Sequence, residues 1–231
     1  MGEMGPNSSK PEPTDIKDLF EANDKVKNAS LIIGGPLTEA LQYIKNTKGP
    51  PKTVYAMLGT RTNDRNIMGR PQFNVGKDAE SANAFLKKIV DERIQMLVVP
   101  TECCKGKDEK DPCPYVLERC QYKELLGKSP LMSRMVPWWG EETGQETLYH
   151  AFDWITATVV TRQDIFKWVP VKHKACLSGK SVTNTKFAKS TQPSTIFMAK
   201  PDYRYIDREK PVLWEELKRT FPRDGGLRIE K

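Results

Sequence analysis

The sequence predicts a single α/β domain in which a twisted mixed sheet is flanked by helices. An amphipathic helix pattern from Asp78 to Glu92 leads directly into the almost wholly apolar run Ile94–Val99. Further short apolar runs alternate with helical patterns along the chain. A strand that is apolar on both faces must be covered on both, as it is in a central sheet with helices on its two sides. The 231 residues are enough to bury one such core.

The N-terminal segment has few apolar residues that could be buried in a core. Residues 1–14 are rich in Gly, Pro, Ser and charge, so we expect a disordered tail there. The single α/β domain is expected to cover residues 15–231. It should open with a short helix at Asp15–Ala22 and a strand within Lys25–Ile33, where Gly34-Gly35-Pro36 stops the strand.

The next elements follow from periodicity and from turn residues. In Pro36–Asn46 the apolar residues recur at helical spacing, and Gly49-Pro50-Pro51 ends the pattern. Thr53–Leu58 is a short apolar strand candidate, followed by the polar loop Gly59–Lys77, which holds Arg61, Arg65 and Arg70. Asp78 is expected to cap the helix that precedes the strand Ile94–Val99.

Two more strands are expected in the second half of the chain, at Tyr149–Val160 and Trp168–Leu177. Pro211 is placed to begin a last helix, because proline is favoured in the first turn. That helix is expected to end at Arg223-Asp224-Gly225-Gly226.

The charge of the chain is concentrated in one segment. The net charge is +7, and Lys167–Lys200 holds seven lysines and no Asp or Glu. Within it, Val169–Thr183 consists of an apolar run that leads into Gly-Lys-Ser. This pattern is similar to that of a phosphate-binding loop. An anion is therefore the first ligand to expect, although a solvated basic face would have the same composition.

The cysteines do not indicate a metal site. Cys103, Cys104, Cys113 and Cys120 lie within a short span, but they do not form the closely spaced pairs that hold zinc. We expect reduced thiols, no metal and no cofactor. The chain also has no apolar run long enough to span a bilayer and no signal-peptide pattern, so we expect a soluble protein of the cytoplasm or nucleus, with no membrane partner.

The middle of the chain resembles a protein tyrosine phosphatase domain. The resemblance lies in Phe85-x2-Lys88-Ile89-x2-Glu92, in the strand that leads to Thr101-Glu102, and in Pro112-Cys113-Pro114-Tyr115. It extends loosely over residues 20 to 185. Leu86, Pro112 and Leu117 depart from the Trp, Lys and Pro of the family pattern. The resemblance implies a phosphatase-like fold.

The signature loop of that family aligns with His173–Ser181. His173, Gly179 and Ser181 then coincide with their counterparts, Lys174 takes the place of the nucleophilic Cys, and Lys180 takes the place of the phosphate-binding Arg. Thr156 stands where the family has its general acid Asp. Because a lysine ammonium cannot act as the nucleophile there, the resemblance implies a protein that is not an enzyme but a pseudophosphatase. A rival alignment ends the resemblance before any signature loop.

Three classes of function remain open from the sequence. The first is a catalytically inactive, tyrosine-phosphatase-like scaffold that binds a phosphotyrosine-containing protein or a kinase through His173, Lys174, Gly179, Lys180 and Ser181. The second is a basic nucleic-acid-binding protein, for which no motif is present. The third is an enzyme of another class, with Arg61, Arg65 and Arg70 holding an anionic substrate. The sequence does not indicate an oligomeric state.

Overall fold

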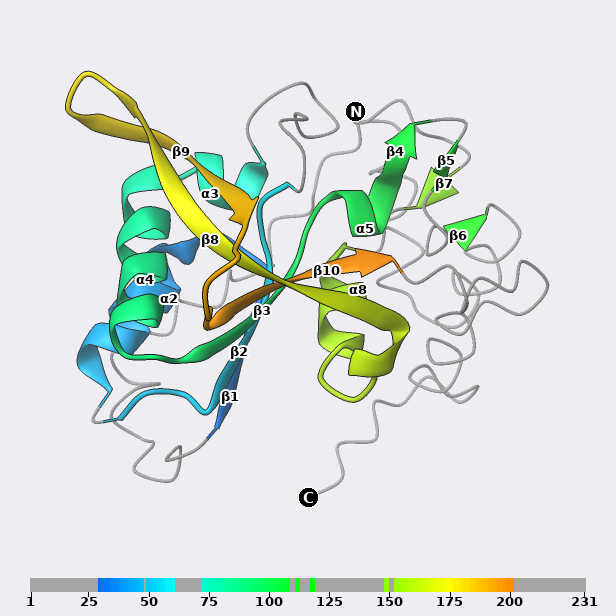
Figure 1. Cartoon of the computed structure of the whole chain (residues 1–231), viewed down its shortest axis with the longest axis horizontal. Coiled ribbons are helices and arrows are strands. Elements are labelled where there is room, and N and C mark those ends of the chain that lie inside the picture. Colours follow the sequence, from blue (N-terminus) through cyan, green and yellow to red (C-terminus); the bar gives the residue numbers. More distant parts are fainter. Residues whose placement is uncertain are drawn as a thin grey trace, which may run out of the picture.

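A six-stranded mixed sheet forms the centre of the molecule (Figure 1). The computed structural model describes residues 29–47, 49–60, 72–108, 111–112, 117–118, 148–149 and 152–201. The strand order is β1-β2-β3-β10-β8-β9. The bounds are β1 Ser30–Ile33, β2 Thr53–Met57, β3 Gln95–Val99, β10 Ile196–Pro201, β8 Phe166–Ser178 and β9 Ser181–Lys189.

Four neighbouring strands of this sheet are parallel and end at the same edge. β1 pairs with β2, β2 with β3, and β3 with β10, all in parallel. β8 is antiparallel to β10, and β9 is antiparallel to β8. The carboxyl ends of β1, β2, β3 and β10 therefore lie side by side, which is where α/β sheets bind their ligands.

Helices cover the sheet on two faces. α2 (Leu37–Asn46), α3 (Phe73–Gly76) and α4 (Ala79–Asp91) lie on one face, and α8 (Phe152–Thr158) lies on the other (Figure 1). The short helix α5 (Glu102–Lys105) follows β3, and the 3-10 turn η2 (Gln163–Ile165) precedes β8. The two small strand pairs are β4 (Gly106–Asp108) with β5 (Asp111–Pro112), and β6 (Leu117–Glu118) with β7 (Leu148–Tyr149).

The alternation of side chains along β2 and β3 divides the core into two layers. Val54 and Ala56 of β2 pack with α2 and α4, whereas Tyr55 and Met57 pack with α8. All five residues of β2 are buried, so both of its faces are covered, as expected of a parallel strand inside an α/β sheet. Leu58, which follows β2, and Phe85 of α4 have no exposed surface. Each such buried apolar side chain contributes about 1.5–3 kcal/mol by leaving water.

Several expectations from the sequence are confirmed. The chain is α/β with a mixed sheet flanked by helices. The strand expected at Ile94–Val99 is β3, and it lies in the middle of the sheet. The helix expected before this strand is α4, and it begins directly after Asp78, whose Oδ1 accepts the backbone N–H of Ser81 at 3.0 Å. β1, α2 and β2 also form where the apolar patterns predict them.

One expected strand is wrong. Residues expected to form a strand over Tyr149–Val160 form the helix α8 at Phe152–Thr158. The β-branched residues of this segment favour a strand by propensity, but Ile155 and Val159 are spaced to face the sheet together and have no exposed surface. The hydroxyls of Thr156 and Thr158 donate to the carbonyl oxygens of Phe152 and Trp154, one turn earlier, so packing and local hydrogen bonds outweigh propensity.

The basic segment forms a long hairpin. β8 and β9 pair in an antiparallel register from Val171↔Lys189 to Ser178↔Ser181, and the hairpin projects past the start of α4 (Figure 1). Gly179 adopts φ 60° at the first position of the two-residue turn, the conformation that a type II′ turn requires there. The phosphatase-like loop expected at Lys174–Ser181 is therefore not formed, because two strands and a tight turn take its place.

Some expectations concern residues outside the described part of the chain. These are the tail at 1–14, the helices at Asp15–Ala22 and after Pro211, the three arginines of the loop after Gly59, and the side chains of Cys113 and Cys120. None of the helices that the structure describes is long and apolar enough to cross a membrane.

Candidate functional site at the carboxyl ends of the parallel strands

Loops and side chains meet where the parallel strands end. Gly34 directly follows β1, and Gly59 and Thr101 each lie two residues beyond the ends of β2 and β3. The backbone N–H and the hydroxyl of Thr101 both donate to the carbonyl oxygen of Gly59, at 3.1 and 3.2 Å. The ends of β2 and β3 are thereby held together just beyond the sheet.

Asn74 of α3 holds the ends of β1 and β2 together. Its buried amide nitrogen donates to the carbonyl oxygen of Gly34 at 2.9 Å and to that of Met57 at 2.8 Å. Gln72, whose side-chain oxygen caps α3, donates from its amide to the Met57 sulfur at 3.2 Å. Replacing a buried amide that donates to two carbonyl groups would leave both acceptors without a partner and would lower the free energy of unfolding. This part of the site is therefore a rigid support.

A carboxylate lies directly over the end of β1. The position that a Cβ would occupy on Gly34 is 3.0 Å from Asp153 Cγ and 3.1 Å from its Oδ1. A larger residue at position 34 would have to displace this carboxylate. Gly34 therefore allows Asp153, which belongs to the first turn of α8, to approach the backbone at the edge of the sheet.

The environment of Asp153 perturbs its ionisation. Its side chain is exposed, yet the protein atoms around its carboxyl displace water, and this desolvation raises the pKa of Asp153 above its ordinary value. Two other carboxylates of the described residues are engaged or buried. Asp78 accepts from Thr38 Oγ1 at 2.7 Å and caps α4, and Glu102, at the end of β3, is only 6% exposed.

A pocket of about 260 Å³ opens on the other side of this edge, among β8, β9 and β10. Its apolar wall consists of Val169, Val171, Phe187, Met198 and Ala199, and its two charged lining residues are Lys189 and Lys200. Phe187 also touches the end of β2, because a Cβ on Gly59 would lie 2.5 Å from Phe187 Cε2. The pocket is therefore adjacent to the carboxyl ends of the parallel strands.

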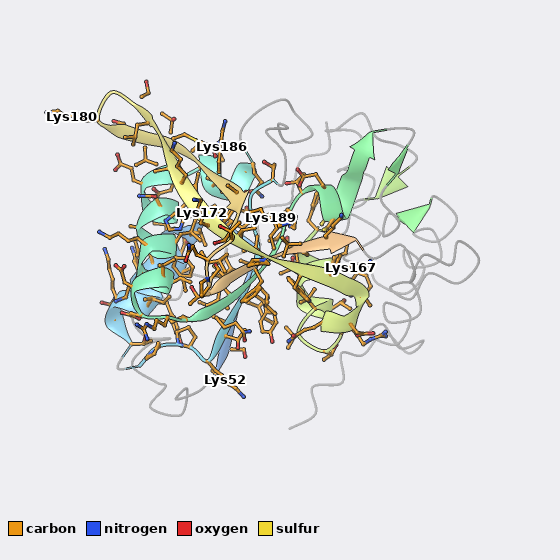
Figure 2. All side chains as sticks on the ribbon, in the orientation of Figure 1. Lys52, Lys167, Lys172, Lys180, Lys186 and Lys189 are labelled. Carbon is orange, nitrogen blue, oxygen red and sulfur yellow. The ribbon has the colours of Figure 1, made fainter. Side chains whose placement is uncertain are left out.

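The residues predicted as an anion-binding loop lie elsewhere. His173 and Lys174 are in β8, Gly179 and Lys180 form the hairpin turn, and Ser181 begins β9. Figure 2 shows Lys180 at the tip of the hairpin, away from the strand ends. His173 faces Asp91 of α4, and burial lowers the pKa of His173 despite the attraction of that carboxylate. Anion binding by these five residues stays a prediction.

Sequence reasoning missed Asp153, Asn74, Lys189 and Lys200 as a group. Asn74 lies in α3 and Asp153 in α8, whereas Lys189 ends β9 and Lys200 lies in β10. The available signal was Gly34 and Gly59, which mark the ends of two apolar runs. In the described part of the chain, no three His, Cys, Asp or Glu side chains come together to hold a metal ion. Cys103 and Cys104 are buried, and each donates from its thiol to a backbone carbonyl, of Ala199 and of Pro100 respectively.

Comparisons with known proteins identify the fold. No protein-family model matches the chain, and no curated protein resembles it in sequence. Its fold is similar to that of a purine-preferring ribonucleoside hydrolase from Gardnerella vaginalis, with a TM-score of 0.63 and 12% identity over 92% of this chain and 69% of the other. It is also similar to a plant nucleoside hydrolase, with a TM-score of 0.60 and 15% identity over 91% and 68%.

A third similar structure is the type III effector XopQ in complex with adenosine diphosphate ribose. The TM-score is 0.51 at 10% identity, over 86% of this chain and 60% of XopQ. The chain thus spans about 60–69% of the length of these three proteins. At such low identities the likeness is one of fold, and the fold is that of the nucleoside hydrolases.

These neighbours correct three expectations. The resemblance to a tyrosine phosphatase is wrong, because the structure neighbours are nucleoside hydrolases and related effectors. An inactive, phosphatase-like scaffold is therefore wrong as well, and the basic nucleic-acid-binding alternative gains no support from them. The expectation that the chain is not an enzyme is also overturned, since the similar folds belong to hydrolases.

Proposed function

We propose that the chain hydrolyses the N-glycosidic bond of a ribonucleoside at the carboxyl ends of β1, β2, β3 and β10. The observation that carries the proposal is the carboxylate of Asp153, which lies against Gly34 at the end of β1 with its pKa raised. An exposed, perturbed carboxylate at the ligand-binding edge of a sheet is a candidate catalytic group. The hydrolase fold of the neighbours supports the same reaction class by analogy.

Besides positioning, the reaction requires a proton acceptor for the water and a proton donor for the departing nitrogen. Water adds its oxygen to C1′ of the ribose, and the bond from C1′ to the base nitrogen breaks. A general base takes a proton from the attacking water and later returns it to the solvent, and a solvent water protonates the departing nitrogen, so that ribose and the free base leave. A carboxylate with a raised pKa is a stronger base than an ordinary one, so we assign the base to Asp153.

The surroundings of Asp153 fit this role. Gly34 leaves the room that the carboxylate occupies. The side-chain amide of Asn74 donates to the carbonyl oxygen of Gly34 at 2.9 Å, and this hydrogen bond fixes the backbone there. Group transfer is sensitive to displacements of about 1 Å. A carboxylate held against a fixed strand end meets that requirement better than one on a loop.

The test is a hydrolysis assay with a matched control. The purified full chain is incubated with inosine, adenosine or uridine, and the free base is measured by chromatography. We expect release by the wild type and a loss of about 100-fold or more in Asp153→Asn, as for removal of a general base. Asp91→Asn, which removes an exposed carboxylate at the end of α4, should leave the rate unchanged.

One result would reject this function, and a second would reject the role of Asp153 in it. One is the absence of base release from all three nucleosides by protein that is folded by circular dichroism. The other is equal activity of Asp153→Asn and the wild type, which would show that Asp153 does not take part.

A further inference from the structure

We infer that the lysine pocket among β8, β9 and β10 binds the phosphate of a phosphorylated ribonucleoside, so that the preferred ligand is a nucleotide and not a neutral nucleoside. This deepens the proposed function and rests on it. The pocket joins an apolar wall to two lysines, and no acidic residue lines it.

The two lysines are available to a ligand. Lys189 and Lys200 are exposed, and within the described residues neither forms an ion pair. They come from different strands, since Lys189 ends β9 and Lys200 lies in β10. In Figure 2, Lys189 lies at the base of the hairpin, at the end of β9. Two ammonium groups that line one pocket form a site for a doubly charged anion.

The apolar wall of the pocket favours an anion at its lysines. Val169, Val171 and Met198 lower the local dielectric, and this would strengthen the attraction of a phosphate to Lys189 and Lys200.

The dimensions of the site favour a ligand with more than one part. β1 and β10 lie three strand spacings apart, which is about 14 Å. A ligand whose ribose lies at Asp153 needs a further group to approach Lys200. A phosphate on the ribose is such a group, and it would pass over the strand ends to the face that packs α2 and α4, where Val171, Phe187 and Met198 line the pocket. The pocket, at about 260 Å³, is too small for a whole nucleotide.

The experiment compares inosine with inosine 5′-monophosphate by calorimetry on the full chain. We expect the nucleotide to bind the wild type at least about tenfold more tightly than the nucleoside, as charge-assisted hydrogen bonds provide. Lys189→Ala and Lys200→Ala should each weaken nucleotide binding by about tenfold and leave inosine binding within about twofold. Inorganic phosphate should compete with the nucleotide in the wild type and not in the double variant.

Two matched lysines control for overall charge. Lys52 lies at the amino end of β2, the opposite end of the sheet, and Lys186 lies on the hairpin outside the pocket (Figure 2). Both are exposed, so Lys52→Ala and Lys186→Ala remove the same charge without touching the pocket. We expect both variants to bind the nucleotide like the wild type. Equal losses in all four variants would overturn the pocket and indicate diffuse attraction.

The outcomes separate this inference from the proposed function. If inosine binds and is hydrolysed, and the monophosphate binds no more tightly, the phosphate site is rejected while the hydrolase function stands. If the monophosphate binds through Lys189 and Lys200 but no base is released from nucleoside or nucleotide, the phosphate site stands and hydrolysis is rejected. If neither ligand binds, both are rejected.

Discussion

Gly59 is the residue at which backbone conformation and packing both demand glycine. It adopts φ 70°, and a Cβ would lie 2.5 Å from Phe187. Gly179 has a similar φ of 60° with nothing near its Cβ position. Gly179→Ala should therefore cost about 1–2 kcal/mol of unfolding free energy through backbone strain alone, and Gly59→Ala should cost more because Phe187 must also move. Urea denaturation of both variants measures the difference, and equal costs would mean that β9 does not pack on the end of β2.

The ionisation of Asp153 gives a pH dependence with a defined sign. Desolvation raises the pKa of Asp153 in the folded chain above the ordinary 3.8. At pH values between 3.8 and this raised pKa, the folded state therefore binds more protons than the unfolded state. Stability therefore falls as the pH rises through this window. The variant Asp153→Asn, which stays neutral, should gain stability relative to the wild type as the pH rises from about 3 to about 7.

Urea denaturation of the wild type and Asp153→Asn across that range checks this expectation. Because the side chain is exposed, solvent screening makes the effect small, so the sign of the change is the test. A difference that is constant with pH, or that favours the wild type at neutral pH, would contradict the raised pKa and weaken the assignment of Asp153 as the base.

At the scale of elements, α4 depends on its N-cap. The Asp78 carboxylate accepts the Ser81 backbone N–H first and foremost, and also the hydroxyl of Thr38, and these bonds lower its pKa. Asp78→Ala should cost about 1 kcal/mol near neutral pH. A lowered pKa stabilises the fold above 3.8 and loses this effect as the pH falls through the folded value, so the cost should shrink in acid.

Glu80→Ala provides the control for this cap, because Glu80 is exposed in the same first turn. Its removal should cost only a few tenths of a kcal/mol through the helix dipole. Thermal unfolding of both variants near neutral and acid pH measures the two costs. Equal costs, or a cost for Asp78→Ala that does not change with pH, would contradict the capping role.

The elements that sequence predicted best are those in which one signal dominates. α4 and β3 have a cap, a continuous apolar face and a wholly apolar run, and each signal favours the same structure. α8 was mispredicted because its β-branched residues favour a strand while its packing requires a helix. The sequence Ser178-Gly179-Lys180-Ser181 is compatible both with a hairpin turn and with a phosphate-binding loop. The alternation of apolar and polar residues on either side of it was the signal that favours the hairpin.

For the molecule as a whole, the sequence predicted the α/β class and could not predict the site. The class follows from the alternation of apolar strands and amphipathic helices, which is a local property. The site combines residues 34, 59, 74 and 153 near the strand ends with the pocket residues 189 and 200, and only the strand order makes the elements that carry them neighbours. In particular, β10 lies between β3 and β8 although it comes last among the described strands, and no local pattern predicts that insertion.

The central claim is that a ribonucleoside binds at the carboxyl ends of the parallel strands. A crystal structure of the chain grown with inosine tests it most directly. The account predicts the ribose beside Gly34, within hydrogen-bond distance of the Asp153 carboxylate. Inosine bound on the outer face of the hairpin around Lys174 and Lys180, or strand ends that stay free of ligand at saturating inosine, would contradict it.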